Sequence, residues 1–442
     1  MFNGKRRMKI LFATIPMVTA VAGCAKEPYS GSAVEESVAN KVAPHSLEAF
    51  HIAFAPGADE TERTFSWHTR GMDKKAVVEL NRLDEKDNVL SSETFEATVE
   101  GILRGQSRHK ATITGLEQNQ LYAYRFGDGQ RAWSQTYTFR TQATEDADFN
   151  FLFFGDPQIG AGDGTQIDAA GWDRTVTAAT ELFPDTDFLV SAGDQVNRAN
   201  KPIQYEGWFS PEELTAYPIM PIVGNHDAAS FADYFNVLNE TGLGGDSEAS
   251  DFYFIYGNTL FIALNTQSDA VGEHREALEL AVSENPDATH RIVLLHKSLY
   301  SSADHALDED VLALRDGLVP VFDELDIDAV LMGPDHVYVR TYQMKGDEVV
   351  GETAYDKEGA AVDPEGTLYL TGNSSTDSKY YEMQDPSIYE RYAAVALQLE
   401  EPTFMNVGVT DASLTFTTYK TYKTADLSVV DKYRIVKTEG DE

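Results

Sequence analysis

Apolar and polar residues alternate with a period of two in the N-terminal part of the chain, between residues 49 and 143. Four short runs show the pattern: Thr64–Thr69, Ala111–Thr114, Tyr122–Phe126 and Thr136–Phe139. Turn residues separate the runs, and a series of short alternating strands is typical of an all-β sandwich. We therefore predict a sandwich over residues 49–143.

The pattern changes after Phe149, where apolar runs that indicate buried strands alternate with helical patterns such as Val311–Phe322. The runs are Phe149–Phe154, Asp187–Ser191, Ile219–Val223, Leu260–Leu264, Arg291–Leu295, Ala329–Met332 and Thr367–Leu370. Strands that alternate with helices indicate an α/β domain, which we place at residues 149–438. Alternation with a period of two returns after Arg391, so the last segment is expected to add strands to a sheet.

The first residues have the pattern of a secretory signal peptide. Positive side chains precede an apolar run, Ile10–Ala22, that is short for a membrane span. The run ends in Val21-Ala22-Gly23-Cys24, which resembles the bacterial lipobox, whose cysteine is lipidated. We predict a signal peptide at residues 1–23, lipidation of Cys24 and a tether at residues 24–48. The protein would then be an extracytoplasmic, bacterial membrane-anchored lipoprotein that meets the membrane only through this anchor; the alternative is an ordinary secretory signal.

The charge balance excludes one class of partner. The chain has 35 Lys and Arg against 72 Asp and Glu, a formal net charge of −37. Such a field repels the phosphate backbone of nucleic acids, so no nucleic-acid partner is expected. It also repels small anions, unless bound cations reverse the sign locally. Because Cys24 is the only cysteine, a metal ion in the mature domains must be held by Asp, Asn, Gln or His.

Clusters of polar residues follow five of the apolar runs. They are Gly155-Asp156-Pro157-Gln158, Gly193-Asp194-Gln195, Gly224-Asn225-His226-Asp227, Leu295-His296-Lys297 and Gly333-Pro334-Asp335-His336. α/β enzymes place their sites at the carboxyl ends of strands. Five clusters that all contain carboxylate, amide or imidazole ligands predict a site for hard or borderline metal ions at this edge.

On these motifs the chain resembles the purple acid phosphatase-like and calcineurin-like metallophosphoesterase family from Phe149 to about Lys437. Two later segments, Leu295–Ser302 and Gly372–Ser374, are similar to its bacterial members. The β-rich part resembles the fibronectin type III-like N-terminal domain of purple acid phosphatases, with Leu116 and Tyr122 placed as in a tyrosine corner. The resemblance implies a β-sandwich followed by two packed mixed sheets flanked by helices. It also implies an acid phosphatase-like hydrolase of phosphate monoesters or small phosphodiesters.

The resemblance assigns roles to individual residues around two divalent or trivalent ions of Fe, Mn or Zn. Two such ions neutralise phosphoryl charge and lower the pKa of bound water, so that a hydroxide bound to them is the nucleophile. Asp194 would bridge both ions. The other ligands would be Asp156, Gln158 and His336 for the first ion, and Asn225 and His296 for the second.

Four further residues would act on the substrate. His226 would stabilise the transition state or protonate the leaving oxygen, and Asp227 would orient its imidazole or, alternatively, serve as a helix N-cap. His305 and Arg340 would contact the phosphate or the leaving group, with a surface role as the alternative for each. The substrate would be a small phosphorylated molecule.

Three positions depart from the family pattern. Gln158 replaces a histidine, and Asn197 replaces the tyrosine that colours the purple enzymes. Pro334 stands where the family has a histidine ligand of the second ion, with Asp335 next to it. Because proline has no side-chain donor atom, we predict weakened occupancy of the second site and reduced activity.

The Pro334 position also supports a competing hypothesis, a catalytically silent surface lipoprotein that binds a ligand or partner and retains the phosphoesterase fold. Retention of three candidate histidines argues against it. An extracellular nuclease would share the metals but conflicts with the acidic charge.

Overall fold

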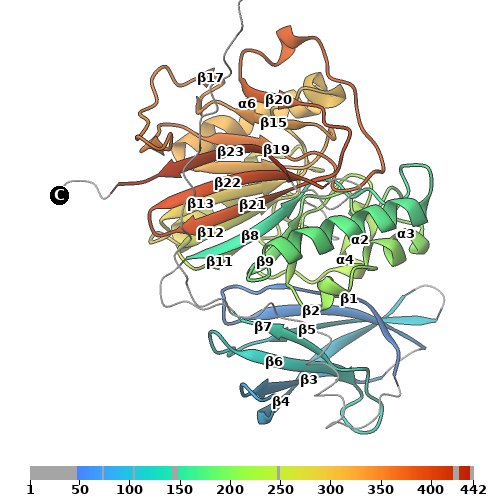
Figure 1. The fold of residues 1–442 in the computed structure, drawn as a ribbon. Coiled ribbons are helices and arrows are strands. Elements are labelled where there is room, and N and C mark those ends of the chain that lie inside the picture. The colour runs from blue at the N-terminus through green and yellow to red at the C-terminus, as the bar shows by residue number, and fades with distance from the viewer. Residues whose placement is uncertain are drawn as a thin grey trace, which may run out of the picture.

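A computed structural model describes residues 47–71, 74–102, 105–141, 148–245, 249–421 and 428–438. They form a β-sandwich joined to a larger α/β domain (Figure 1). The signal peptide and Cys24 lie outside the described residues, as does the tether except for its last two residues. None of the described helices is long and apolar enough to cross a membrane.

The N-terminal domain is the predicted all-β sandwich, with strands in the order β1-β2-β5-β4-β3-β6-β7. The strands are β1 (Ala49–Pro56), β2 (Arg63–Arg70), β3 (Ala76–Leu83), β4 (Val89–Ile102), β5 (Gln106–Ile113), β6 (Leu121–Gly127) and β7 (Tyr137–Arg140). The long β4 belongs to both layers, since its first part pairs with β3 and its last part with β5. Alternate residues of β5 are buried, as a strand with one face on a core requires.

Aromatic side chains fill the space between the two layers, among them Phe54, Phe65 and Trp67. The tyrosine corner is present: the phenolic oxygen of Tyr122 accepts a hydrogen bond of 2.8 Å from the backbone N–H of Glu117.

The C-terminal domain contains two seven-stranded mixed sheets packed face to face, ordered β10-β9-β8-β21-β22-β23-β18 and β11-β12-β13-β14-β19-β15-β20. Strands of the first sheet are β8 (Phe149–Phe154), β9 (Phe188–Ser191), β10 (Ile219–Pro221), β18 (Ala361–Val362), β21 (Thr403–Thr410), β22 (Ser413–Lys420) and β23 (Ser428–Val436). Those of the second are β11 (Phe252–Tyr256), β12 (Thr259–Leu264), β13 (His290–Leu295), β14 (Ala329–Met332), β15 (Tyr338–Thr341), β19 (Leu368–Thr371) and β20 (Ala393–Leu397). A separate hairpin joins β16 (Met344–Lys345) to β17 (Glu348–Val349). The predicted α/β class is confirmed, and the last segment adds strands to the sheets as expected.

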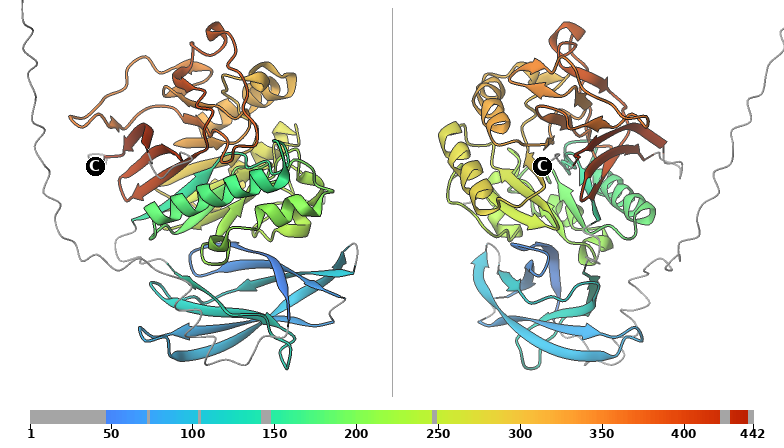
Figure 2. Two further views of the ribbon diagram at one scale, coloured as in Figure 1. Left: turned by 45° about the vertical axis from the view of Figure 1, so that its right-hand side comes forward. Right: turned by 90° about the vertical axis from the view of Figure 1, so that its left-hand side faces the viewer.

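Helices cover the outer faces of both sheets (Figure 2). They are α2 (Thr165–Leu182), α3 (Pro202–Trp208), α4 (Phe231–Tyr234), α5 (Val271–Glu284) and α6 (Glu309–Glu324), with 3-10 turns η1 (Glu212–Thr215), η2 (Ala228–Ser230), η3 (Asp304–Leu307) and η4 (Pro386–Ile388). Trp172 and Val176 of α2 pack on β8 and β9, whereas Leu314 and Leu318 of α6 pack on the other sheet. Because β8, β9 and β10 are parallel, and β12, β13, β14 and β19 are parallel too, their carboxyl ends gather at shared edges.

The two domains meet along one face of β2. Three alternate side chains of this strand hydrogen-bond to main-chain carbonyl oxygens of the segment that includes α4. The pairs are Thr64 Oγ1 with Asn236 O at 2.6 Å, Ser66 Oγ with Tyr234 O at 2.6 Å, and His68 Nε2 with Asp233 O at 2.8 Å. The period of two along β2 therefore matches a row of acceptors on the neighbouring domain.

A pair of buried histidines lies at this interface. The Nδ1 atoms of His51 and His68 are 3.1 Å apart. Because a carbonyl oxygen only accepts, His68 Nε2 must donate to Asp233, which leaves His68 Nδ1 as the acceptor of a proton from His51. Burial lowers the pKa of His51 from 6.5 to about 3, and it also lowers the pKa of His68 despite the nearby Asp233. Both rings are therefore neutral at physiological pH.

This pair should make the protein less stable in acid. A histidine whose pKa is lower in the folded state takes up a proton on unfolding once the pH falls below 6.5. Its contribution to stability is thus complete above pH 6.5 and declines toward pH 3, the lowered pKa of His51. We expect the melting temperature of a His51→Phe variant to fall less steeply than that of the natural protein between these pH values. Equal slopes in thermal scans would contradict the assignment.

Candidate metal centre

Candidate ligands gather at the carboxyl ends of five strands. Asp156 and Gln158 follow β8, Asp194 follows β9, Asn225 and His226 follow β10, His296 follows β13, and His336 follows β14. Gln158, Asp194 and His336 have positive φ angles of 39°, 45° and 47°. Residues other than glycine rarely adopt this left-handed backbone conformation, and it persists only where the surrounding structure holds it in place. Such residues are often found at functional sites.

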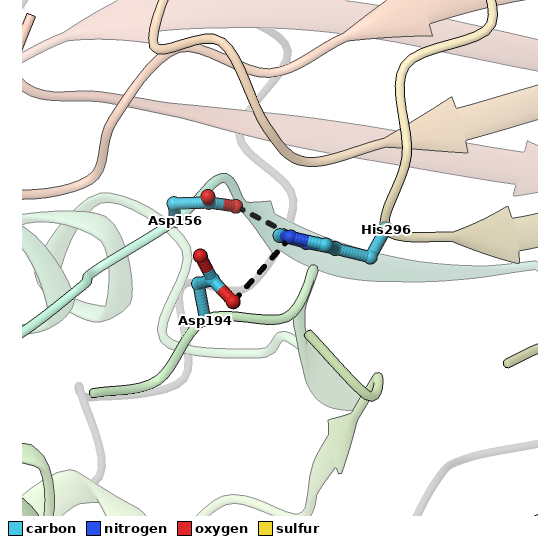
Figure 3. A group of neighbouring side chains, drawn as sticks. All are labelled: Asp156, Asp194 and His296. Carbon is cyan, nitrogen blue, oxygen red and sulfur yellow. Dashed lines mark ion pairs between the residues drawn. The ribbon is translucent and has the colours of Figure 1, made fainter. Parts of the chain in front are cut away.

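The centre of this edge is a group of three buried side chains, Asp156, Asp194 and His296 (Figure 3). One ligand atom from each lies within 4.8 Å of the others. His296 Nδ1 lies 3.6 Å from Asp156 Oδ1, and His296 Nε2 lies 3.4 Å from Asp194 Oδ1. Gly193 allows this approach, because a Cβ there would lie 2.4 Å from His296 Nδ1.

The proton positions on His296 leave several acceptors facing one another. Its Nδ1 lies 2.9 Å from the carbonyl oxygen of Ala192, so Nδ1 must carry the proton that is donated. In the neutral ring Nε2 then has only a lone pair, and it lies 3.1 Å from Asn225 Oδ1 as well as 3.4 Å from Asp194 Oδ1. A cation between such atoms removes the repulsion, and a carbonyl that fixes the tautomer is the usual partner of a metal-binding histidine.

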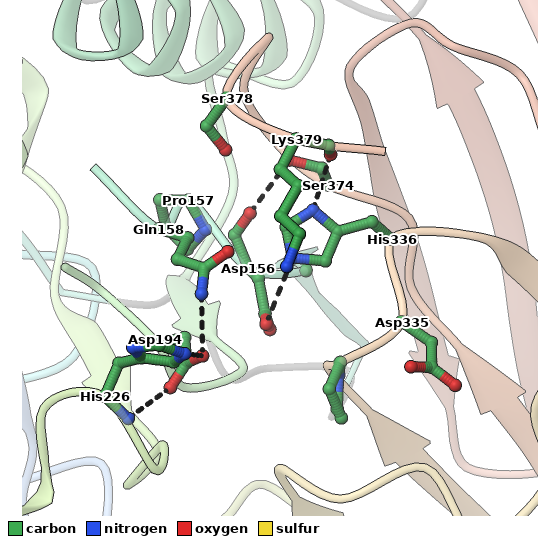
Figure 4. Close-up of polar contacts among 12 residues, drawn as sticks. Asp156, Pro157, Gln158, Asp194, His226, Asp335, His336, Ser374, Ser378 and Lys379 are labelled. Atoms are coloured by element: carbon green, nitrogen blue, oxygen red, sulfur yellow. Dashed lines mark hydrogen bonds and ion pairs between the residues drawn. The ribbon is translucent and has the colours of Figure 1, made fainter. Parts of the chain in front are cut away.

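His336 repeats this arrangement (Figure 4). Its Nδ1 lies 2.6 Å from the carbonyl oxygen of Lys379 and therefore donates to it. Its Nε2 faces Asp156 Oδ2 at 3.6 Å. Burial lowers the pKa of His336 to about 4, so the ring is neutral and Nε2 again presents a lone pair. Two atoms that bind one ion at about 2.1 Å in tetrahedral geometry lie about 3.4 Å apart. This is close to the 3.6 Å between His336 Nε2 and Asp156 Oδ2.

Two buried oxygens of the group have no hydrogen-bond partner among the described residues, Asp156 Oδ1 and Gln158 Oε1. The amide nitrogen of Gln158 lies 3.4 Å from Asp194 Oδ2, so the side chain already points into the group. Burial raises the pKa of Asp156, even though His296 lowers it, because the charged carboxylate is poorly solvated. Orphaned acceptors and an unfavourable buried charge both fit a site for a cation.

A cavity of about 270 Å³ opens beside these ligands. Other residues on its wall are Gln267, Lys297, His305, Asp308, Asp310, Val311, Pro334, Asp335 and Tyr381. Lys297 Nζ pairs with Asp310 at 2.6 Å, and His305 Nδ1 pairs with Asp308 at 2.7 Å. Burial lowers the pKa of His305, but the charges of Asp335 and Asp308 outweigh it and raise the pKa overall. The wall therefore carries the Lys297 ammonium and an imidazole that holds its proton more tightly than usual, each paired with a carboxylate.

Asp335 does not point toward the second set of candidate ligands. Both of its carboxylate oxygens lie 3.2 Å from the backbone N–H of His305, and the side chain is buried. In the view of Figure 4, Asp335 lies apart from Asp194, with Asp156 between them. Pro334 lines the cavity and offers its carbonyl to Ser298 Oγ at 2.9 Å. Among the described residues, the structure thus brings together Asp194, Asn225 and His296 on this side of the site, and Pro334 adds no side-chain donor atom to them.

Comparison with known families agrees with this geometry. Residues 48–141 match the family model of the purple acid phosphatase N-terminal domain, and residues 149–338 match that of the calcineurin-like phosphoesterases. No curated protein matches the chain.

The overall fold also occurs in a solved structure. A purple acid phosphatase from yellow lupin (Lupinus luteus) seeds shares the fold with a TM-score of 0.69 and 16% sequence identity, over 88% of this chain and 75% of that chain. Vps29 from Chaetomium thermophilum aligns at 13% identity over 66% of this chain and 100% of its own, with a TM-score of only 0.30.

Asp227 has a different role from the one expected. It does not contact the His226 imidazole; its two oxygens accept hydrogen bonds from the backbone N–H groups of Gln195 at 2.6 Å and Gly224 at 2.9 Å. His226 Nδ1 lies 2.8 Å from the carbonyl oxygen of Asn197, which orients the ring instead. Asp227 stands at the N-cap position of η2, as the alternative predicted, but its side chain makes no capping hydrogen bond there. Asp227 holds together two ligand loops of the phosphoesterase domain.

The expected substrate contact of Arg340 is wrong. Arg340 lies within β15, and its guanidinium pairs with Asp431 of β23 at 2.6 Å. Tyr338, two residues earlier on the same face, donates to the same carboxylate at 2.8 Å. The pleat directs this face toward the sheet that contains β23, so Arg340 takes no part in lining the cavity.

Residues 374–376 support the loop that carries Asp156. The sequence motifs had indicated only the segment Gly372–Ser374 of this region. Hydroxyl groups of Ser374, Ser375 and Thr376 donate to the carbonyl oxygens of Asp156 at 3.0 Å, Gly155 at 2.6 Å and Pro157 at 2.8 Å. The run of three hydroxyl residues was the available sequence signal. Lys297, which also lines the cavity, belongs to the Leu295-His296-Lys297 cluster but was assigned no role, and no motif indicated Tyr381.

Metal ions should stabilise the protein through this site. Titrating Mn²⁺ or Zn²⁺ into metal-free protein should raise the melting temperature, because an ion at 100 times its dissociation constant adds about 2.7 kcal/mol to the free energy of unfolding. Asp194→Ala should remove most of this shift, because Asp194 faces both His296 and Gln158. The exposed Asp316→Ala on α6 is the matched control and should keep it. A full shift in Asp194→Ala would place the ions elsewhere.

Arg340→Met should destabilise the fold without affecting metal binding. Its loss leaves the largely buried Asp431 carboxylate with the hydrogen bond from Tyr338 but with no opposite charge, which should lower the free energy of unfolding by about 3 kcal/mol in urea titrations. Lys345→Met, which breaks an exposed pair with Glu365, should leave stability nearly unchanged. Weaker metal binding in Arg340→Met at full stability would contradict its structural role.

Proposed function

We propose that the protein is a metal-dependent phosphoric ester hydrolase that acts on small phosphate monoesters. The observation that carries the proposal is the close approach of carboxylate, amide and imidazole ligand atoms of Asp156, Asp194, Asn225, His296 and His336 beside a cavity. The family match of residues 149–338 and the fold shared with a purple acid phosphatase support it.

Two ions of Fe, Mn or Zn would be held by different parts of this set. Asp156, Gln158, His336 and Asp194 form the more complete group, and Asp194, Asn225 and His296 form the other. Bound there, the ions would neutralise the phosphoryl oxygens and lower the pKa of water toward neutrality. Since Pro334 supplies no donor atom, we propose that the second ion binds more weakly than the first.

His226 is the residue best placed to move a proton. Its Nδ1–H donates to the carbonyl of Asn197, so protonation occurs at Nε2, which is on the cavity wall 3.8 Å from Asp194 Oδ2. The side chain is 37% exposed, which gives a substrate access to it. In the imidazolium form Nε2–H would donate to the leaving oxygen of the ester.

The cavity and its charges favour a small ester. About 270 Å³ is slightly below the usual range for small-molecule pockets. His305 and Lys297 would attract the phosphate, whereas the net charge of −37 opposes nucleic acid. A compact monoester, or a small diester, fits both conditions.

We also propose that the protein works outside the cytoplasm, held to a bacterial membrane by lipid on Cys24. The lipobox-like Val21-Ala22-Gly23-Cys24 after the apolar run supports this proposal. Replacing Cys24 by Ser should release the protein from the membrane fraction of cells. Retention of the variant in that fraction would contradict the anchor.

The first test is hydrolysis of p-nitrophenyl phosphate by protein that lacks residues 1–24, with Mn²⁺, Fe²⁺ or Zn²⁺ added separately. Turnover should rise with metal, disappear in Asp194→Ala and persist in Asp316→Ala. Pro334→His adds the missing imidazole and should tighten binding of the second ion by about tenfold or more, by comparison with losses of outer ligand partners. At limiting metal concentrations, the hydrolytic activity of Pro334→His should rise together with this affinity.

The other outcomes have distinct meanings. Turnover by Pro334→His alone would describe a phosphoesterase that this substitution has disabled. No turnover by either protein, with metal bound and several phosphate esters supplied, would overturn the proposal in favour of a surface protein that binds a ligand.

A further inference from the structure

The loop that carries Asn225 and His226 continues directly into the domain interface. The backbone N–H of His226 donates to Asp194 Oδ1 at 2.9 Å, which ties the loop to the centre of the site. After Asp227 the chain forms η2 and then α4, and this segment lies on the β-sandwich. Only seven positions separate His226 from Asp233, whose carbonyl is bound by His68.

The sandwich holds the far end of this segment by its main chain. Thr64, Ser66 and His68 bind three of its carbonyl oxygens at 2.6 to 2.8 Å. In the other direction, the side-chain amide of Asn236 donates to the carbonyl oxygens of Phe65 at 3.3 Å and Ala111 at 3.2 Å. Thr64, Ser66 and His68 are all buried, so each lost donor would leave an acceptor without water.

The short segment between the two ends is stiff. Tyr205 of α3 stacks on Tyr234 with 3.6 Å between ring centres, and its hydroxyl lies 2.6 Å from Ser230 Oγ. At the other end Asp227 binds the backbone N–H groups of Gly224 and Gln195. A displacement of the interface would therefore be transmitted to the ligand loop rather than absorbed between them.

We propose that the β-sandwich is a positioning element of the metal centre, in which Thr64, Ser66 and His68 fix the segment from Asp233 to Asn236 and through it Asn225 and His226. The inference concerns the placement of the loop and does not require that the protein hydrolyse esters. It applies most strongly to the second group of ligands, because that group has lost the histidine at position 334 and relies on Asn225.

The test compares variants in which these donors are removed or kept. Thr64→Val, Ser66→Ala and His68→Phe are combined to remove the three donors and nearly keep the volume and the ring packing. The change at His68 also removes the acceptor of the His51 proton. A combined Thr64→Ser and Ser66→Thr exchange retains the hydroxyls. Tyr122→Phe weakens the tyrosine corner inside the sandwich, away from the interface, and serves as the control for general destabilisation.

Hydrogen exchange of metal-free protein is the first measurement, since it reports on the loop whether or not the protein is an enzyme. Amides of residues 222–230 should exchange about tenfold faster or more in the triple variant, because local opening becomes easier. In the Thr64→Ser, Ser66→Thr double variant and in Tyr122→Phe, the amides of that segment should exchange at rates close to those of the natural protein. If the triple variant does not fold, Ser66→Ala alone should show the same change to a smaller degree.

Cobalt(II) binding, followed by its visible absorption, is the second measurement. The affinity of the weaker site should fall by about tenfold in the triple variant, the size of effect expected from an outer support. Unchanged exchange in residues 222–230 of the folded triple or single variant would overturn the proposal. Equally accelerated exchange of residues 222–230 in Tyr122→Phe would also overturn it.

Discussion

The structure is organised around one electrostatic constraint, the burial of several carboxylate and imidazole acceptors close to one another. His296 Nε2 lies 3.4 Å from Asp194 Oδ1, and His336 Nε2 lies 3.6 Å from Asp156 Oδ2. Burying unpaired charge costs much more than burying a paired one. The raised pKa of Asp156 reports this cost. A cation at this place removes the repulsion, so that metal binding and stability of the fold are linked.

The rest of the domain is arranged to hold these acceptors in place. Parallel strands bring their ends to one edge, and carbonyl groups of Ala192, Lys379 and Asn197 set the tautomers of three histidines. Hydroxyls of residues 374–376 hold the loop that follows β8. Nearly every support is a main-chain atom or binds one, so the geometry depends on the path of the backbone more than on particular surface residues.

The same principle extends across the domain boundary. The contact between β2 and the segment after His226 uses three side-chain donors and three main-chain acceptors. The buried pair of His51 and His68 gives this contact a defined direction of proton donation, which is lost when either ring gains a charge. The β-sandwich is thus joined by hydrogen bonds to the segment that continues from Asn225 and His226, on the side of the site where Pro334 stands.

The sequence by itself determined the two fold classes and the identity of the residues that meet at the strand ends. Periods of two and the lengths of apolar runs are local properties, and polar residues after buried strands of parallel sheets must emerge at one edge. The direction of each side chain was decided only by the tertiary structure. Arg340 faces Asp431, about ninety residues later, because of how β15 and β23 pack.

The side-chain directions of Asp227 and Asp335 could not be predicted from the sequence either. Asp227 binds the backbone N–H of Gln195 on a different loop, and Asp335 turns to His305 on another. Neither partner is close in sequence, and a carboxylate in a loop accepts whichever N–H group the packing brings near. Residue types, which the sequence shows, limit the chemistry of the site; the contacts that assign each residue its role arise from long-range packing, which no local pattern contains.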